Sequence, residues 1–176
     1  WAAILGGIVP VPVAVGISDE HRLKLFRILR QLERGTLYSD AALVERLIEF
    51  ATKKEHDVIV SKLNDNSITE INIESVGPGE IIEASPDKTA FIQYSSGSTS
   101  DPKGVCLNHQ NLTANIRAIV EGAEWTADDQ SLSWMPLTHD MGLIGYHLSV
   151  MAAGMNHAVM DTSVFVRRPL LWMEKA

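Results

Sequence analysis

Short apolar segments alternate with amphipathic segments in the first part of the chain, and this order limits the possible folds more than any other feature. Residues 6–13 (GGIVPVPV) are typical of a buried strand that is entered through glycines and limited by prolines. Apolar residues then recur at helical spacing from residue 25 to 32 and from residue 44 to 51, and a short strand is predicted between them at residues 36–39. Strands joined by crossover helices predict an α/β fold of layered sheet and helices, with largely parallel strands.

Polar residues at the expected helix ends support both helices. Ser18 and Asp40 are suited to act as N-caps, and Gly35 is suited to end the first helix. Residues 56–66 fit neither the helix pattern nor the strand pattern, whereas residues 68–73 (ITEINI) alternate like a strand. Residues 75–87 are loop-like, so we expect a boundary there between a first portion at 1–78 and a second portion at 86–176.

The second portion continues the alternation of strands and helices. Strands are predicted at residues 89–94 (TAFIQY), 104–109 (GVCLNH) and 131–136 (SLSWMP). A helix is predicted between the last two of these strands, because apolar residues recur at helical spacing from residue 112 to 120.

Composition narrows the class of protein. The chain of 176 residues carries a formal net charge of −7, so it lacks the basic footprint of a nucleic-acid or anionic-membrane partner. A single cysteine, Cys106, excludes an intrachain disulfide and fits a reducing compartment, so we expect a cytoplasmic protein. The apolar start is interrupted by Pro10 and Pro12 and is too short for a membrane span of about 20 residues. Because the chain starts inside an apolar run and stops inside an expected helix, we expect it to be part of a longer one.

Residues 94–105 (YSSGSTSDPKGV) form a tight loop between two apolar strands, which a flexible linker would not. Gly97 allows a close backbone approach, Lys103 adds a positive charge, and four hydroxyl side chains can donate hydrogen bonds to an anion, namely Ser95, Ser96, Ser98 and Thr99. The loop is not a Walker A motif, because Pro102 and Gly104 stand where that motif has its second glycine and its Ser/Thr. On composition alone, a phosphate-binding loop and a plain hairpin turn both remain open.

A second stretch, residues 133–148 (SWMPLTHDMGLIGYHL), places His139 and Asp140 between an expected strand and an apolar helix that contains glycines. His139 could be a satisfied structural residue, and Asp140 could be a helix N-cap. Both stretches nevertheless follow strands, and the loops at strand ends are where α/β proteins usually bind ligands.

These two stretches resemble the core motifs of the adenylate-forming superfamily of AMP-dependent synthetases and ligases. The loop 94–105 is similar to its phosphate-binding motif, and residues 134–145 (WMPLTHDMGLIG) are similar to the next motif, with wording most like the fatty acyl-AMP ligase branch. Residues 6–13 and 165–172 (FVRRPLLW) also look like that branch. One departure is Ser100, where the family usually has glycine. The resemblance implies that the whole chain is a fragment of one adenylation N-terminal domain, with the phosphate loop in the portion 86–176.

The resemblance also implies an activity. The family joins a carboxylic acid to ATP, giving an acyl-adenylate and pyrophosphate, and this branch then passes the acyl group to a carrier protein. A fatty acid is the expected substrate, and ATP with Mg²⁺ is the expected cofactor, the Mg²⁺ ligand lying outside this chain. Free CoA as acceptor and a non-catalytic nucleotide- or acyl-binding module remain alternatives. We expect residues 1–176 alone to be inactive, because the family's ribose, metal and lid residues lie beyond them.

Site residues follow from the resemblance, position by position. The residues implied at the ATP phosphates are Ser95, Ser96, Gly97, Ser98, Thr99, Lys103 and Gly104. His139 would orient the substrate carboxylate, and Met141, Gly142 and Leu143 would help to form the wall of the acyl tunnel. His109 and His147 have no metal-ligand partners at useful spacing, so no metal site is expected among these residues.

Overall fold

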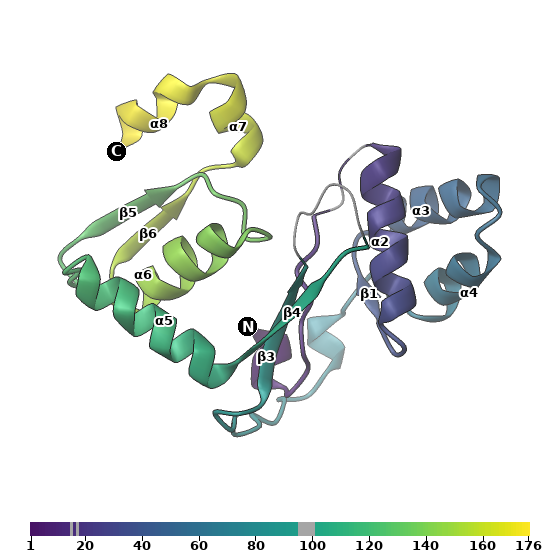
Figure 1. Ribbon diagram of the computed structural model, residues 1–176, viewed down its shortest axis with the longest axis horizontal. Helices are drawn as coiled ribbons and strands as arrows, with labels where there is room; N and C mark the ends of the chain where they lie inside the picture. The colour runs from purple at the N-terminus through teal and green to yellow at the C-terminus, as the bar shows by residue number, and fades with distance from the viewer. Residues whose placement is uncertain (15, 17, 95–100) are drawn as a thin grey trace. The chain divides into compact units, whose positions relative to one another are not determined.

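The computed structural model describes residues 1–14, 16, 18–94 and 101–176 of the chain (Figure 1). Its contacts divide the chain into two compact units. The first unit contains Trp1–Val13, Ile81–Tyr94 and Gly104–Ala176, and the second contains Ala14–Glu80 and Ser95–Lys103. The boundary that we expected within residues 75–87 stays a prediction.

The second unit combines α-helices with a short parallel pair of strands. Its elements are α2 (Asp19–Gln31), β1 (Leu37–Tyr38), α3 (Ala41–Lys53), α4 (Asp57–Asp65), β2 (Ser67–Ile68) and the 3₁₀ turn η1 (Ile73–Ser75). β1 and β2 run parallel and are connected through α3 and α4, as a crossover connection requires. Apolar side chains of the three α-helices form the core of this unit, with Phe26, Leu47 and Ile59 almost fully buried.

The predicted N-caps of this unit are confirmed. The Ser18 hydroxyl accepts a hydrogen bond from the His21 N–H, and the Asp40 carboxylate accepts one from the Leu43 N–H. The ambiguous residues 56–66 prove to be helical, since they contain α4.

Two boundaries in this unit were predicted wrongly. α2 ends at Gln31 and not near Gly35, because Leu32 turns to an extended conformation and the Lys62 ammonium donates to the Leu29 and Leu32 carbonyls at 2.8 and 2.9 Å. The expected strand at residues 68–73 stops after Ile68. The Asn72 side chain accepts a hydrogen bond from the Glu74 N–H instead, and such a local turn competes with strand pairing.

The first unit combines an antiparallel hairpin, a parallel strand pair and several helices. Its elements are α1 (Ala2–Leu5), β3 (Thr89–Tyr94), β4 (Gly104–Asn108), α5 (His109–Gly122), β5 (Gln130–Ser133), the π-helix η2 (Met141–Leu148), α6 (Ser149–Ala152), β6 (Asn156–Val159), α7 (Thr162–Arg167) and α8 (Pro169–Lys175). β3 and β4 pair antiparallel, whereas β5 and β6 pair parallel across η2 and α6. Ala90 and Phe91 of β3, Leu112 of α5 and Ile144 of η2 form a buried cluster. The strands predicted on both sides of the loop 94–105 are therefore confirmed.

The buried strand expected at residues 6–13 is wrong. The segment follows the short helix α1 and forms no strand, and Ile8 and Val9 are exposed. Pro10 and Pro12 have no N–H to donate, so a continuous ladder is not available to this segment. It still contacts β3 through one hydrogen bond, in which the Ile92 N–H donates to the Pro10 carbonyl at 3.0 Å.

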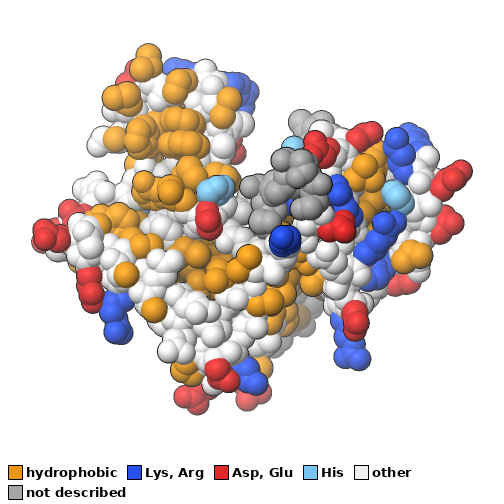
Figure 2. Space-filling model, viewed as in Figure 1, with side chains coloured by type: hydrophobic (Ala, Val, Ile, Leu, Met, Phe, Trp, Pro, Cys, Tyr) orange, Lys and Arg blue, Asp and Glu red, His pale blue; other side chains and the backbone are white. Residues whose placement is uncertain are grey.

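Aromatic side chains near the end of the first unit pack on one another. Trp134 leaves β5 and stacks on Phe165 of α7 with ring centroids 3.9 Å apart, and Trp172 of α8 meets Phe165 edge-on. The Trp172 indole N–H also donates to the Leu132 carbonyl of β5 at 2.9 Å. Both tryptophans are half-buried, and Figure 2 shows further hydrophobic side chains gathered around α7 and α8. Among the helices that the structure describes, none has the length and apolar character needed to cross a membrane.

Candidate functional site

The hairpin β3–β4 carries the ends of the predicted phosphate loop. Tyr94 and Gly104 are the last paired residues of the hairpin, so the loop starts and finishes at adjacent positions. The predicted phosphate-binding residues Ser95, Ser96, Gly97, Ser98 and Thr99 lie outside the described residues, as does Ser100.

Gly104 lies where a side chain would be crowded. A Cβ atom at this position would be 3.0 Å from the Ile92 side chain and 3.1 Å from the Tyr94 ring. Burial raises the pKa of the Tyr94 phenol above its ordinary value of about 10, and the neighbouring Cys106 adds to the shift. Gly104 therefore has a packing role beside a neutral Tyr94 at the end of the loop.

Lys103 is exposed at the other end of the loop, directly after the buried Pro102. Among the described residues, Lys103 has no hydrogen bond or ion pair. The Pro102 carbonyl accepts a hydrogen bond from Gln31 Nε2 of α2 at 3.1 Å. Gln31 was missed by the sequence analysis, and no local pattern could have indicated it, because it lies 71 positions before Pro102.

His139 lies in the turn between β5 and η2 with a side chain that is 56% exposed. The backbone N–H of His139 donates to the Pro136 carbonyl at 3.0 Å, and the His139 carbonyl accepts from the Leu143 N–H at 2.8 Å. The backbone on both sides of the imidazole is therefore fixed, while the ring itself is accessible to a ligand.

Asp140 orients the His139 ring. Its Oδ1 lies 2.7 Å from His139 Nδ1 and also 2.7 Å from the Met141 nitrogen, whereas the Met141 nitrogen lies 3.2 Å from His139 Nδ1. Nδ1 cannot both donate to the carboxylate and accept from Met141, so we assign the proton to Nδ1 and the Met141 N–H to the carboxylate. Asp140 is thus the N-cap of η2, which is one of the alternatives that the sequence left open, and His139 Nε2 has no hydrogen-bond partner among the described residues.

The residues after His139 form the π-helix η2, whose three predicted acyl-contact residues lie in different environments. The side chain of Met141 is 55% exposed, whereas Leu143 packs against the buried cluster of the first unit. Gly142 is buried against the chain at Pro136, where an added Cβ would collide with the carbonyl group. π-Helical turns are rare and often occur at functional sites. Ser149, which is fully buried, closes this helix by donating its hydroxyl to the Ile144 carbonyl at 2.7 Å.

The end of β3 contacts the second sequence motif. The Gln93 side chain donates a long hydrogen bond of 3.5 Å to the Thr138 carbonyl, and Thr138 directly precedes His139. The strand that leads into the phosphate loop therefore ends beside the turn that holds His139.

Among the described residues, no group of three or more His, Cys, Asp or Glu side chains could hold a metal ion. Cys106 is an exposed residue of β4.

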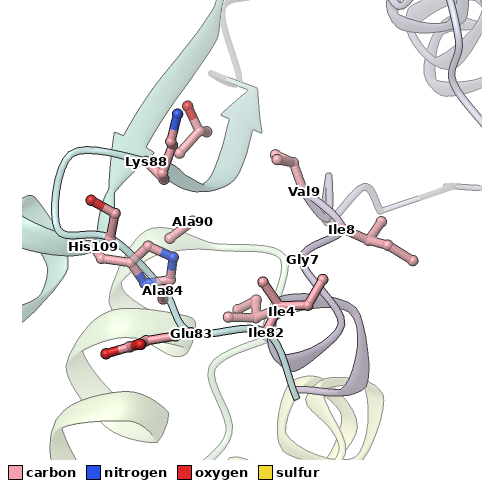
Figure 3. Close-up of a pocket in the computed structure, with 12 residues that line it drawn as sticks. Ile4, Gly7, Ile8, Val9, Ile82, Glu83, Ala84, Lys88, Ala90 and His109 are labelled. Atoms are coloured by element: carbon pink, nitrogen blue, oxygen red, sulfur yellow. The ribbon is translucent and has the colours of Figure 1, made fainter. Parts of the chain in front are cut away.

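The first unit also contains a hollow of about 450 Å³. Its lining residues belong to neither of the two sequence motifs. Figure 3 shows the N-terminal residues Ile4 and Gly7–Val9 facing the segment from Ile82 to Ala90, with Lys88 and His109 also lining the hollow.

Solved structures define the class of fold. The chain superposes on McyG A-PCP complexed with phenylalanyl-adenylate with a TM-score of 0.85 and 26% sequence identity, covering 99% of this chain and 28% of that one. It superposes on the fatty acyl-adenylate ligase of Legionella pneumophila, solved with acyl adenylate and pyrophosphate, with a TM-score of 0.78 and 27% identity, covering 98% of this chain and 29% of that one. The structure is therefore part of an adenylation domain of the α/β adenylate-forming fold, as predicted.

The family model for AMP-binding enzymes matches residues 2–175. The chain belongs to this family of AMP-binding enzymes, and the predicted resemblance is confirmed.

Three individual relatives carry different names. A protein of Caulobacter vibrioides that carries the name acyl-CoA synthetase is 47% identical over 90 residues, which cover 51% of this chain and 16% of that protein. The long-chain-fatty-acid–AMP ligase FadD32 of Mycolicibacterium smegmatis is 30% identical over 99% of this chain and 27% of its own length. The medium-chain-fatty-acid–[acyl-carrier-protein] ligase JamA of Moorena producens is 28% identical over 98% of this chain and 30% of its own length. The chain thus spans less than a third of the length of these relatives.

Proposed function

We propose that the whole protein activates a fatty acid with ATP, forms an acyl-adenylate with release of pyrophosphate, and passes the acyl group to a carrier protein. The observation that carries this proposal is the junction at the end of β3. There the strand that enters the Ser/Gly/Thr loop is hydrogen-bonded, through Gln93 and Thr138, to the turn that holds His139. Family membership supports the same activity.

In the proposed reaction, an oxygen of the substrate carboxylate attacks the α-phosphorus in line, and the bond from this phosphorus to the bridging oxygen of pyrophosphate breaks. Negative charge increases on the phosphate oxygens, so catalysis depends on positioning and on electrostatic stabilisation. Lys103 carries an exposed ammonium without a partner among the described residues, and we assign it to the β- and γ-phosphates together with Ser95, Ser96, Gly97, Ser98 and Thr99. Gly104 would allow β4 to pass close to the nucleotide.

We assign His139 to the substrate carboxylate as an orienting residue. With Nδ1–H directed to Asp140, Nε2 can accept a hydrogen bond when the ring is neutral and can donate one to a carboxylate when it is protonated. Met141 is exposed two positions after His139 and is suited to contact the acyl chain, whereas Gly142 and Leu143 would contribute to the wall mainly through packing. Mg²⁺ would supply charge neutralisation at the phosphates, and none of the steps assigned here to protein residues depends on it.

A fatty acid is the substrate class that the relatives favour, because FadD32 and JamA are named as fatty-acid ligases. An apolar tunnel would bind such a tail with roughly 0.8 kcal/mol per buried CH₂ group. The JamA name also supports a carrier protein as acceptor. ATP as co-substrate and a single cysteine both fit a cytoplasmic location.

Free CoA is the second candidate acceptor, and the acyl-CoA synthetase name of the Caulobacter relative favours it. Incubation of the full-length protein with ATP and fatty acids, with either CoA or a phosphopantetheinylated carrier protein, separates the two by the mass of the products. Acylated carrier protein supports the proposal, whereas efficient acyl-CoA formation moves the protein to the second candidate. ATP binding without pyrophosphate exchange for any acid would indicate a non-catalytic binding module.

A further inference from the structure

The backbone before Lys103 is held by a side chain from a distant helix. Gln31, the last residue of α2, donates its Nε2–H to the carbonyl of the buried Pro102 at 3.1 Å. We propose that Gln31 is a positioning residue that fixes Lys103 for contact with the nucleotide phosphates. This inference rests on the proposed function only in the assignment of Lys103 to those phosphates.

The peptide plane between Pro102 and Lys103 explains how Gln31 can act on the next residue. The Pro102 carbonyl and the Lys103 N–H belong to one peptide group, and in a trans peptide they point in opposite directions. No cis peptide occurs in the described part of the chain. When Gln31 holds the carbonyl toward α2, the Lys103 N–H is directed away from α2. Proline also fixes φ at Pro102, so the orientation of this plane relative to the preceding peptide depends on ψ of Pro102 alone.

The groups that this arrangement presents are available to an anion. Within the described residues, neither the Lys103 N–H nor its exposed ammonium has a hydrogen-bond or ion-pair partner. One backbone N–H and one ammonium from the same residue are a suitable pair of donors for phosphate oxygens. Fixing the peptide plane therefore sets the direction of the Lys103 N–H. It also sets the position of the Lys103 Cα atom, from which the side chain with the ammonium extends.

Gln31 lies at a helix end that is itself held by hydrogen bonds and by packing. The Lys62 ammonium of α4 donates to the Leu29 and Leu32 carbonyls at 2.8 and 2.9 Å, and these two residues flank Gln31 at the end of α2. Leu25 and Phe26 bury the preceding turn of α2 in the core of the second unit. A binding group held by a packed helix is positioned more accurately than one held by a loop alone.

The binding test compares ATP with AMP, because AMP lacks the β- and γ-phosphates. Gln31→Met keeps the length of the side chain and removes the Nε2–H donor. Gln31→Glu keeps the shape of the side chain and removes the same donor. Gln110→Met is the matched control, since Gln110 is an exposed helical glutamine whose side chain has no hydrogen bond in the described part of the chain. Binding of ATP and AMP to the full-length protein is measured by calorimetry for each variant and for the same variants combined with Lys103→Ala.

We expect Gln31→Met to weaken ATP binding about threefold to tenfold, the equivalent of one neutral hydrogen bond, and to leave AMP binding and the control unchanged. In the Lys103→Ala background the effect should become smaller, because only the backbone N–H of residue 103 is then left for Gln31 to orient. Equal weakening of ATP and AMP, full additivity with Lys103→Ala, or wild-type ATP binding by a folded Gln31→Met protein would each overturn the inference. If the ATP-specific effect is found but no acid supports pyrophosphate exchange, the proposed function fails and the role of Gln31 stands.

Discussion

Replacement of Gly142 by alanine should disturb the turn that holds His139. A Cβ atom at Gly142 would lie 2.9 Å from the Pro136 carbonyl carbon and 3.1 Å from that of Met135, and closer still to the Pro136 carbonyl oxygen. Non-bonded carbon atoms prefer separations of about 3.5–4.0 Å, so the added methyl is too close by roughly 0.5–1 Å. The obstructing atoms belong to the backbone and cannot rotate away, so the chain at Pro136 must move.

The expected loss of unfolding free energy follows from other substitutions that insert atoms into a packed interior. Inserting a methyl group into a well-packed site costs about 1–3 kcal/mol of unfolding free energy. The displaced Pro136 carbonyl is also the acceptor of the His139 N–H at 3.0 Å, so movement there shifts the imidazole as well. We therefore expect Gly142→Ala to lower both stability and the rate of adenylate formation.

Gly145 provides the matched control in the same helix. A Cβ atom there would meet only the Met141 side chain, at an ordinary 3.6 Å. Gly145→Ala should be neutral or stabilising by up to about 1 kcal/mol, because alanine favours helices over glycine. Urea unfolding and ATP–pyrophosphate exchange of the two full-length variants are compared side by side. If Gly142→Ala is as stable and as active as Gly145→Ala, the close approach of η2 to Pro136 is not a constraint on the protein.

Three further predictions concern other parts of the structure. Lys103→Ala should reduce adenylation efficiency roughly tenfold to a hundredfold, since a hydrogen bond to a charged group is worth about 1.5–3 kcal/mol; wild-type pyrophosphate exchange by a folded variant would reduce the loop to a simple turn. Burial, and then the charge of His147, lower the pKa of His157 below its ordinary value of about 6.5. Below about pH 6.5 the folded protein therefore binds fewer protons than the unfolded chain, and the unfolding free energy should fall as the pH drops. His157→Gln should flatten that dependence in unfolding measured between about pH 5 and 8, and an unchanged slope would contradict it. Asn108→Ala should lower the unfolding free energy by about 0.5–2 kcal/mol in urea unfolding, because Asn108 and Asn111 form a reciprocal cap at the start of α5; a loss within experimental error would show that the cap contributes little.

Local chemistry was predictable from the sequence. Ser18 and Asp40 cap the helices that their positions indicated, because a short polar side chain needs only the N–H groups of the next turn. The two strands around the loop 94–105 were also predicted, since their apolar residues are bounded by clear turn residues. Asp140 caps η2, which the sequence left open as one of its alternatives.

Long-range contacts decided what the sequence could not indicate. The apolar run at residues 6–13 was interpreted as a buried strand, but its prolines have no N–H to donate, and among the described residues it makes a hydrogen bond to β3 through the Pro10 carbonyl. The contact of Gln31 with Pro102 joins residues 71 positions apart, and the crowding of Gly142 depends on how η2 packs against an earlier turn. Neither contact has a periodic or compositional signal. The phosphate-binding assignments at residues 95–99 stay predictions, because they lie outside the described residues.

Acid activation by the full-length protein is the property on which the proposed function depends. The measurement is ATP–pyrophosphate exchange across carboxylic acids of increasing chain length, with wild-type protein and Lys103→Ala in parallel. We predict exchange with medium- or long-chain fatty acids by the wild type and a loss of roughly tenfold or more in the variant. Exchange with amino acids only would contradict the fatty-acid assignment, and the absence of exchange with every acid, in a folded protein that binds ATP, would contradict adenylation itself.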